Sequence, residues 1–421
     1  MKKSFVIIVL AIAAFLSSQL QAQQFSDSNY RAADSQGISE SGNDAIPVGP
    51  FLFSPGVQLS WEHHSNLFQS ATNAVSDDVY VARLRLLFEL PIRESFIRIS
   101  YTPQYRDSKN RTLFNQWDHY VEISGNFEFA SGFLLDAGYR MVDGDVATYE
   151  VDPGSELIFS GRTFTKHSFR VNGDYWVSDR DGLRIAADLS TVSWHGTSIP
   201  TTGSWYDYDQ WRGSFGWLHQ LSPTMVMDLS YGYTDYSPDG SENQFRSYSS
   251  NDLTLGFKGS LNEVLTTEFR LGYLESDFDS SASLHEGFDD FSGVVAMGHL
   301  SWEMAHGSRL RLDLINRPYA SNYDQNSFYT GTSGRLLYDL QMDRLFAQAS
   351  LLSQTNEYDV PDAILNRKRS DDVLTWDVGI GFRLTDYLSL RGRYIHEDRD
   401  SNIDAYGFLN KVYMIDLVLG Y

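Results

Sequence analysis

From Phe51 to Tyr421 the sequence consists of segments of about ten to fifteen residues in which apolar and polar side chains alternate. In the segment 97–106, for example, the odd positions carry Ile, Tyr and Pro, and the even positions carry Arg, Ser, Thr and Gln. A period of two puts successive side chains on opposite faces of a β-strand, whereas a helix needs a period of 3.6. The chain is therefore predicted to be all-β from about residue 50 to its end.

The alternation predicts about eighteen strands, with an uncertainty of about two. They lie near 51–61, 78–90, 95–106, 114–129, 132–141, 162–177, 182–192, 205–219, 223–234, 246–260, 263–275, 289–304, 308–319, 327–341, 344–356, 370–383, 386–396 and 408–421. Glu156-Leu157-Ile158-Phe159, inside the longest connection, leaves a further short hairpin open.

The connections alternate between very short turns and long polar loops. The long ones fall near 62–77, 142–161, 193–204, 235–246, 276–289, 357–370 and 398–407. Tight periplasmic turns, long external loops and an even strand count are typical of a transmembrane antiparallel up-and-down β-barrel of the outer membrane. The mean hydropathy of -0.33 is compatible with such a barrel, because only one face of each strand meets lipid.

A soluble β-sandwich or propeller is the main alternative fold. A sandwich gives no reason for the chain to end on a strand with an aromatic last residue, and a propeller requires a repeat of about 40–50 residues that the sequence does not show. One continuous barrel domain over residues 50–421 is therefore favoured.

The N-terminus resembles an export signal. Met1-Lys2-Lys3 precedes an apolar run from Phe5 to Leu16, and a small-residue site ends at Ala22, which predicts a signal peptide over residues 1–22. A membrane anchor is disfavoured, because a spanning helix needs about 20 apolar residues. Residues 23–49 are polar and aperiodic, and we expect a disordered periplasmic arm there.

The last strand is the most specific single feature. Its unbroken apolar and aromatic face resembles the terminal strand by which the barrel assembly machinery recognises its clients. That face consists of Tyr413, Ile415, Leu417, Leu419 and Tyr421.

The opposite face of many strands carries charged side chains, which are stable beside water but costly in lipid. The predicted lumen-lining residues are Arg98, Arg170, Arg184, Arg212, Arg270, Arg309, Arg311, Arg335, Arg391, Arg393, Glu122, Glu268, Asp188, Asp228, Asp313, Asp377 and Asp416. They favour a polar channel that guides an anionic or hydroxyl-rich solute. Alternatively, they are cross-strand pairs that brace the wall.

Acidic residues also concentrate in the predicted external loops, where we expect them to be solvated and to bind divalent cations loosely near lipopolysaccharide. They are Asp143, Asp145, Glu150, Asp152 and Glu156 in one loop, and Asp277, Asp279, Glu286, Asp289 and Asp290 in another.

Catalytic chemistry and cofactors have no positive support. Cysteine is absent, the net charge of -22 disfavours nucleic acid, and no nucleophile elbow or phosphate-binding loop occurs. His63 and His64 could ligate a metal or act as a base, but the sequence places no third ligand beside them. The acidic run from Asp398 to Asp404 departs from a calcium loop, because Ile403 occupies the glycine position.

Three segments resemble the putative β-barrel porin 2 family of Gram-negative outer membranes. The opening SPGVQLSWEHHSNLFQSATNAVSDDVY contains Asn66-Leu67-Phe68, similar to an Asn-x-Phe element of that family, although Ser65 stands where the family often has Asp. Tyr394 to Asn402 followed by Tyr406 resembles the last hairpin, and Asn316 to Asn322 is a weaker likeness. The resemblance implies a large barrel over about 50–421. It also implies a link to capsule or exopolysaccharide secretion, which some members have.

The leading hypothesis is therefore a passive outer-membrane porin through which a polysaccharide or its oligosaccharides cross, with periplasmic export proteins as partners. A general porin for small solutes is the runner-up. A structural or adhesive barrel with an occluded lumen is the third hypothesis, and an outer-membrane enzyme is the fourth.

Overall fold

The computed structural model describes residues 45–110, 115–129, 132–145, 151, 154–156, 163–195, 206–240, 246–278, 290–304, 307–321, 328–361 and 365–420. The predicted signal peptide and most of the predicted arm lie outside these residues. Of the arm, Ile46–Val48 forms a short strand, β1, that pairs with the start of the next strand. Regular structure therefore begins slightly before the predicted residue 50.

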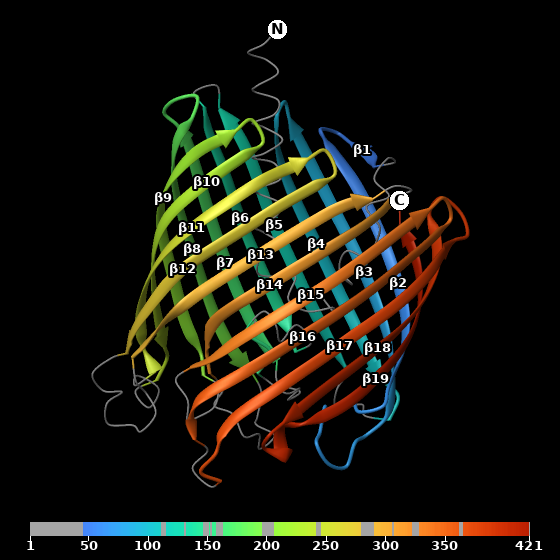
Figure 1. The fold of residues 1–421 in the computed structure, drawn as a ribbon. Helices are drawn as coiled ribbons and strands as arrows, with labels where there is room; N and C mark the ends of the chain where they lie inside the picture. The colour runs from blue at the N-terminus through green and yellow to red at the C-terminus, as the bar shows by residue number, and fades with distance from the viewer. Residues whose placement is uncertain are drawn as a thin grey trace.

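Eighteen antiparallel strands form a closed barrel, as the alternation predicted (Figure 1). They are β2 (Phe51–His64), β3 (Asp77–Ile92), β4 (Ser95–Ser108), β5 (Gln116–Phe129), β6 (Phe133–Gly144), β7 (Thr163–Trp176), β8 (Asp181–His195), β9 (Tyr208–Ser222), β10 (Met225–Pro238), β11 (Tyr248–Asn262), β12 (Leu265–Phe278), β13 (Phe291–Met304), β14 (Ser308–Ala320), β15 (Phe328–Met342), β16 (Leu345–Pro361), β17 (Lys368–Arg383), β18 (Leu388–Ser401) and β19 (Phe408–Gly420). A 3-10 turn, η6 (Asp404–Tyr406), precedes the last strand.

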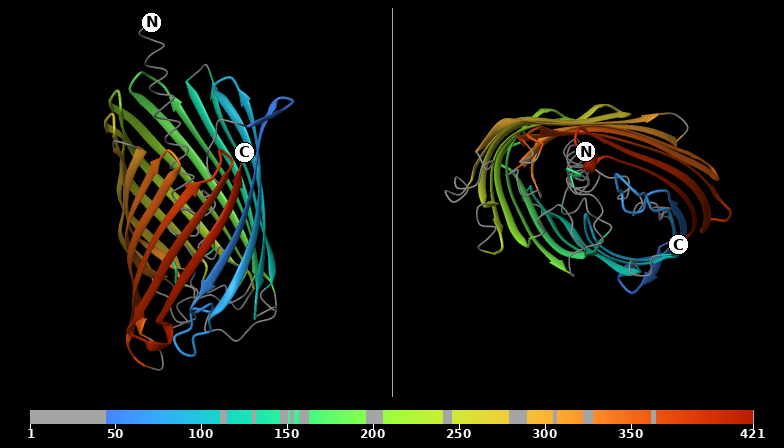
Figure 2. Two further views of the ribbon diagram at one scale, coloured as in Figure 1. Left: turned by 90° about the vertical axis from the view of Figure 1, so that its right-hand side faces the viewer. Right: turned by 90° about the horizontal axis from the view of Figure 1, so that it is seen from below.

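Each strand pairs with its neighbours in sequence, and β19 pairs with β2 to close the barrel. Two to four residues separate the strands at one end of the barrel, and longer connections join them at the other. The C-terminus lies at the end with the short turns (Figure 1). Figure 2 shows the strands tilted around the lumen, as closure of a sheet requires.

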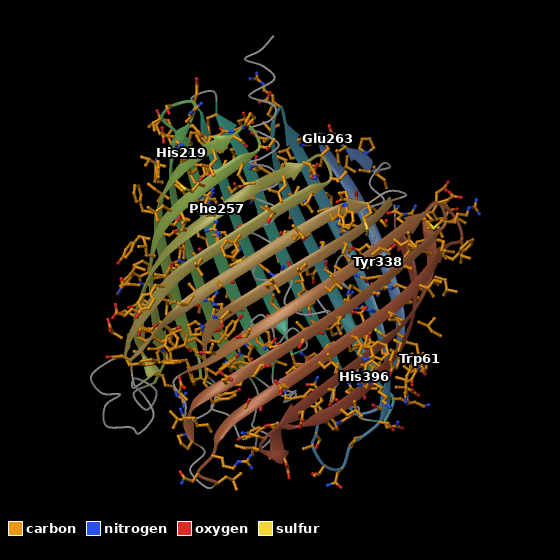
Figure 3. The ribbon with its side chains drawn as sticks, in the orientation of Figure 1. Trp61, His219, Phe257, Glu263, Tyr338 and His396 are labelled. Atoms are coloured by element: carbon orange, nitrogen blue, oxygen red, sulfur yellow. The ribbon has the colours of Figure 1, made fainter. Side chains whose placement is uncertain are left out.

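The outward face is apolar around the whole barrel. Leu59, Phe169, Leu253 and Ile380 are all exposed, and so is the predicted C-terminal face from Tyr413 to Leu419. Trp61, Phe257 and Tyr338 point away from the barrel (Figure 3). A closed sheet with an outward apolar belt leaves no unpaired backbone edge in hydrocarbon, and it is the architecture of outer-membrane proteins. No helix among the described residues is long and apolar enough to span a membrane.

The predicted Asn-x-Phe element lies at the seam between β2 and β19. The backbone N–H of Asn66 donates to Asn410 Oδ1 at 3.0 Å, and Asn66 Nδ2 donates to the carbonyls of Ser70 and Leu409 at 2.8 and 3.2 Å. Asn66 and Asn410 are 2% and 1% exposed. The asparagine therefore ties the first long loop to the last strand.

Replacing Asn66 by alanine should destabilise the barrel by about 2–4 kcal/mol, because three side-chain hydrogen bonds are lost and buried partners stay unsatisfied. Urea unfolding in detergent micelles would measure the loss. Thr72→Ala, at an exposed position of the same loop, is the control and should change stability by less than about 0.5 kcal/mol. Equal stability of the two variants would contradict a clasp at the seam.

Candidate functional site: an inward-folded segment in the lumen

The predicted lumen-lining residues lie on the face of their strands opposite the exposed apolar side chains. Glu268 and Arg270, for instance, alternate with the exposed Phe269 and Leu271 on β12. Arg335, Arg391, Arg393, Glu268, Asp228, Asp377 and Asp416 are buried, and Arg309 is exposed near the short-turn end.

Many of these charges pair with one another along the inner wall. The pairs within the predicted set are Arg170–Asp188 at 3.1 Å, Arg184–Asp228 at 2.7 Å, Arg270–Glu268 at 3.2 Å, Arg391–Asp416 at 2.7 Å and Arg393–Asp377 at 3.3 Å. Other predicted residues pair with groups that the sequence did not single out, as in Arg98–Glu89, Arg140–Glu122, Arg212–Asp252, Arg309–Glu303, Arg311–Asp339 and His299–Asp313. Arg335 lies opposite Asp313 in the register of β14 and β15.

Some pairs skip a strand, because a glycine lies between them. Arg212 on β9 reaches Asp252 on β11 through two bonds of 2.5 and 2.9 Å. The intervening residue on β10 is Gly232, and a Cβ there would overlap Arg212 Nη2 and lie 2.6 Å from Asp252 Oδ1. The missing side chain therefore leaves room for a bidentate ion pair along the inner wall.

Residues 154–156, from the connection between β6 and β7, bind the inner ends of strands on the far side of the barrel. The carbonyl of Gly154 accepts hydrogen bonds from Gln354 Nε2 at 2.6 Å and from Asn356 Nδ2 at 3.0 Å. Both donors belong to β16 and are buried. Since β6 and β16 are not neighbours in the sheet, this segment crosses the lumen.

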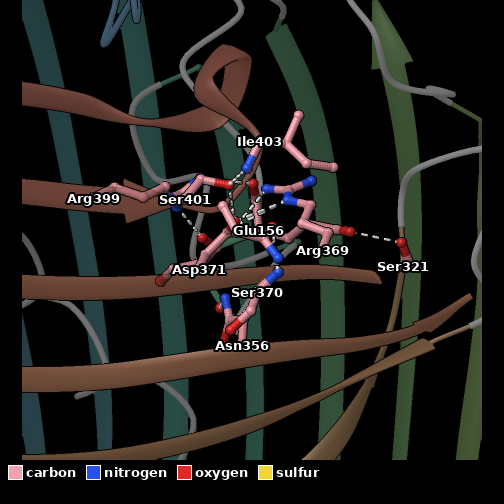
Figure 4. A network of polar contacts seen from close by, with 12 residues as sticks. Glu156, Ser321, Asn356, Arg369, Ser370, Asp371, Arg399, Ser401 and Ile403 are labelled. Carbon is pink, nitrogen blue, oxygen red and sulfur yellow. Dashed lines mark hydrogen bonds and ion pairs between the residues drawn. The ribbon is translucent and has the colours of Figure 1, made fainter. Parts of the chain in front are cut away.

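Glu156 is fully buried at the centre of these contacts (Figure 4). Its Oε1 accepts a hydrogen bond from Ser321 Oγ at 2.6 Å, and its backbone carbonyl accepts one from Arg399 Nη1 at 3.0 Å. Arg399 also donates to the carbonyl of Ser155. Three residues of one loop are thus held by donors that follow β14 and lie on β16 and β18.

A row of tyrosines packs against the segment. Tyr329 and Tyr358 are 0% and 2% exposed, and their rings stack at 5.2 Å between centroids. Tyr319 extends the row, with its ring 5.6 Å from that of Tyr329. A Cβ on Gly154 would overlap the Tyr329 hydroxyl and lie 2.6 Å from its Cζ. Only glycine therefore fits against this row.

Arginines lie over several of these rings. Arg369 lies 4.5 Å from the ring centroid of Tyr358 and 3.7 Å from that of Tyr406, distances typical of cation–π contacts. Asp371 holds its guanidinium at 2.5–3.0 Å, and Ser401 Oγ donates to that carboxylate at 2.7 Å (Figure 4). The arginine is thus fixed over two aromatic faces.

A second aromatic row runs over β9 to β12 and is linked to the first. It consists of Tyr206, Tyr208, Tyr236, Tyr248 and Phe278, with successive centroids 4.9–6.5 Å apart. Arg246 lies over Tyr206 at 5.2 Å and donates to the carbonyl of Ser321 at 3.4 Å. Burial raises the pKa of the Tyr206 hydroxyl, so this group stays neutral at ordinary pH.

The family model described as "Putative beta-barrel porin 2" matches residues 218–421. The match covers just under half of the chain. The family prediction is confirmed there, and the two motifs quoted from the C-terminal half lie within the match, whereas the opening motif precedes it. No curated protein matches the chain.

Three solved structures are similar to the chain at low identity. The ferric citrate transporter FecA, in its unliganded form, is 12% identical, with a TM-score of 0.47, over 84% of this chain and 61% of FecA. OccAB3 of Acinetobacter baumannii is 11% identical, with a TM-score of 0.47, over 89% of this chain and 100% of its own. OpdK of Pseudomonas aeruginosa is 11% identical, with a TM-score of 0.45, over 88% and 99%.

Two predictions about the loops of this barrel are wrong. Glu156 and Asp145 were expected to be solvated loop acids, yet they are 0% and 2% exposed. Asp145 is paired with Arg106, which also bonds Asp118 at 3.0 Å. Polar loops are solvated by default, and here a buried arginine offsets the cost of burying the carboxylate. Glu150, Asp152, Asp279, Glu286, Asp289 and the possible hairpin at 157–159 lie outside the described residues.

The remaining acidic and histidine motifs are wall or rim residues. Asp143 and Asp277 lie within β6 and β12, Asp290 immediately precedes β13, and Asp398 and Asp400 lie within β18. His63 and His64 project to opposite faces of β2 and bond to Asp78 and Glu62 at 2.8 and 3.0 Å. The two histidines therefore do not share a ligand site. Tyr421, the last residue of the predicted assembly signal, lies outside the described residues.

The sequence missed Arg369, Arg399 and the segment 154–156. The predicted strand 370–383 began after the true start of β17, and the predicted strand 386–396 ended before the true end of β18. Both arginines were therefore assigned to loops. Extending the alternation of Arg391, Arg393 and Ile395 by four residues would have placed Arg399 on the inner face.

Proposed function

We propose that this outer-membrane barrel is a conduit for a carbohydrate chain, and that residues 154–156 narrow it until cargo binds. The observation that carries the proposal is the set of lumen tyrosines with arginines over their faces, at the place where the loop crosses. Sugar rings stack their C–H faces on aromatic rings, and arginine forks bind their oxygen atoms. A wall lined with such groups can pass a sugar chain by exchanging one set of contacts for the next.

The direction and setting of transport complete this proposal. We propose that the chain is exported through its N-terminal signal and inserted into a Gram-negative outer membrane through its last strand. There it would pass an exopolysaccharide or capsule chain delivered by periplasmic partners. Support comes from the apolar outer belt and from the family of residues 218–421. No covalent chemistry enters the proposal.

A barrel with a permanently occluded lumen is the second candidate, and a specific observation favours it. Glu156 and Tyr329 are fully buried where the segment meets the wall, so this part of the lumen is filled. Such a barrel would serve as a structural or adhesive surface protein.

Planar-bilayer recording of the purified full-length protein tests these functions. A conduit should give ion current that soluble oligosaccharides interrupt in discrete events, with a frequency that rises with their concentration. Steady current that no oligosaccharide affects would favour a small-solute porin, and absence of current in every condition would favour the occluded barrel. Either result would refute the proposed conduit.

A further inference from the structure

The groups that hold residues 154–156 form a binding site for a chain of oxygen acceptors. Gln354, Asn356 and Arg399 each donate to backbone carbonyls, and Ser321 donates to a carboxylate oxygen. The segment therefore presents three backbone carbonyl oxygens and one carboxylate as hydrogen-bond acceptors to the wall. An acidic sugar presents a comparable set, because it carries several hydroxyl and ring oxygens and one carboxylate.

Some donors and hydroxyls at this place are not used by the segment. Among the described residues, Arg399 is 4% exposed, forms no ion pair with a carboxylate and has a buried Nε without a hydrogen-bond partner. The hydroxyl of Tyr358, which is 2% exposed, likewise has no partner. Buried polar groups are normally paired, so an unpaired one calls for an explanation, and a bound partner at that place is one. The site therefore has two polar groups, Arg399 Nε and the Tyr358 hydroxyl, that could bind a ligand in addition to the donors used by the segment.

The charge of the site favours an anion. Arg399 and Arg369 come from strands β18 and β17, and Arg246 approaches from the other side at Ser321. Asp371 is bonded to Arg369, so Glu156 is the acidic group supplied by the inserted segment itself. If residues 154–156 withdraw, the wall loses one negative charge and keeps its arginines, and a neutral ligand would not replace that charge.

We propose that the cargo is an anionic polysaccharide with carboxylates on its sugar rings, and that Glu156 occupies the place of one such carboxylate when no cargo is bound. This inference rests on the conduit function proposed above and adds the chemical class of the substrate. The segment competes with cargo for the same donors, so a uronate-bearing chain displaces it and a neutral chain does so poorly.

The test compares two probes of equal length in planar bilayers, an oligogalacturonate and a malto-oligosaccharide, on the full-length protein. The anionic probe should interrupt the current through the wild-type protein at a concentration at least tenfold lower than the neutral probe does. Glu156→Gln should lower the half-blocking concentration of the oligogalacturonate several-fold, because the competing charge is removed while an amide oxygen still accepts from Ser321.

Glu357→Gln is the matched control, since Glu357 is an exposed acid on β16 directly after Asn356, and it should leave both probes unchanged. Arg399→Gln should bring the two half-blocking concentrations within about twofold. If that variant does not fold, raising the salt concentration on the wild type should reduce the preference, because screening weakens charge attraction.

Equal block by both probes in the wild type would overturn the anionic cargo and leave the conduit intact. Absence of block by either probe would instead refute the conduit itself. An effect of Glu357→Gln as large as that of Glu156→Gln would also overturn the inference, since general surface charge would then explain the preference.

Discussion

Replacing Gly154 by alanine is expected to raise the conductance of the barrel several-fold. The new Cβ would overlap the Tyr329 hydroxyl and lie 2.9 Å from Tyr319 Cδ2. Tyr329 cannot turn aside, because it is fully buried between the rings of Tyr319 and Tyr358. Overpacking costs about 1–3 kcal/mol. Each hydrogen bond that holds the segment contributes about 1 kcal/mol net, so the overlap offsets about one to three of these bonds.

Single-channel recording in planar bilayers measures this effect. Gly298→Ala is the matched control, because a Cβ at that position of β13 meets nothing closer than 3.7 Å, and its conductance should equal that of the wild type. Unchanged conductance in Gly154→Ala would contradict the idea that residues 154–156 limit flow through the lumen.

Replacing Gly259 by alanine is expected to destabilise the barrel by about 3 kcal/mol or more. Gly259 has a φ of +153°, and a Cβ there would overlap the carbonyl oxygen of Thr224 and lie 2.8 Å from Met225 Cα. These are backbone atoms of the neighbouring turn and strand, so relief of the overlap requires the pairing of β10 with β11 to shift.

The temperature at which the folded band disappears on SDS gels, together with urea unfolding in micelles, measures this loss. Gly392→Ala provides the control, since no atom lies within 4 Å of the Cβ it would introduce. We expect it to match the wild type or to gain a few tenths of a kcal/mol, because glycine weakens a strand interior. Similar melting of both variants would show that the pairing of β10 with β11 tolerates a side chain at Gly259.

The barrel was predictable because its main signal is local. A period of two is visible within any ten residues, and all eighteen strands lie where the alternation placed them. The same period predicted which charged residues face inward, but it did not predict which residues they pair with. Arg212 finds Asp252 two strands away, and only the register of three strands reveals that Gly232 lies between them.

The narrowing of the lumen by residues 154–156 was not predictable in this way. Gly154 and Gln354 are 200 residues apart, and Glu156 and Arg399 are 243 apart, so no local pattern links them. An acidic, glycine-containing connection has the composition of a solvated loop, and its inward course depends on donors that distant strands supply. The prediction of strand ends was inaccurate for a related reason. Where a strand extends beyond the lipid belt its outward residues are polar, and such a segment resembles the sequence of a loop.

The seam between β2 and β19 determines the order in which the barrel can be made. Every other adjacent pair joins consecutive strands and can form as a hairpin, whereas the seam pairs residues as distant as Trp61 and Ile415. Such long-range pairing is slow to form, so the seam closes last. Until then both edge strands expose unpaired backbone groups, which cannot enter hydrocarbon. We therefore expect the two edge strands to stay outside the hydrocarbon, or to be paired temporarily, until Asn66 meets Asn410 at the seam.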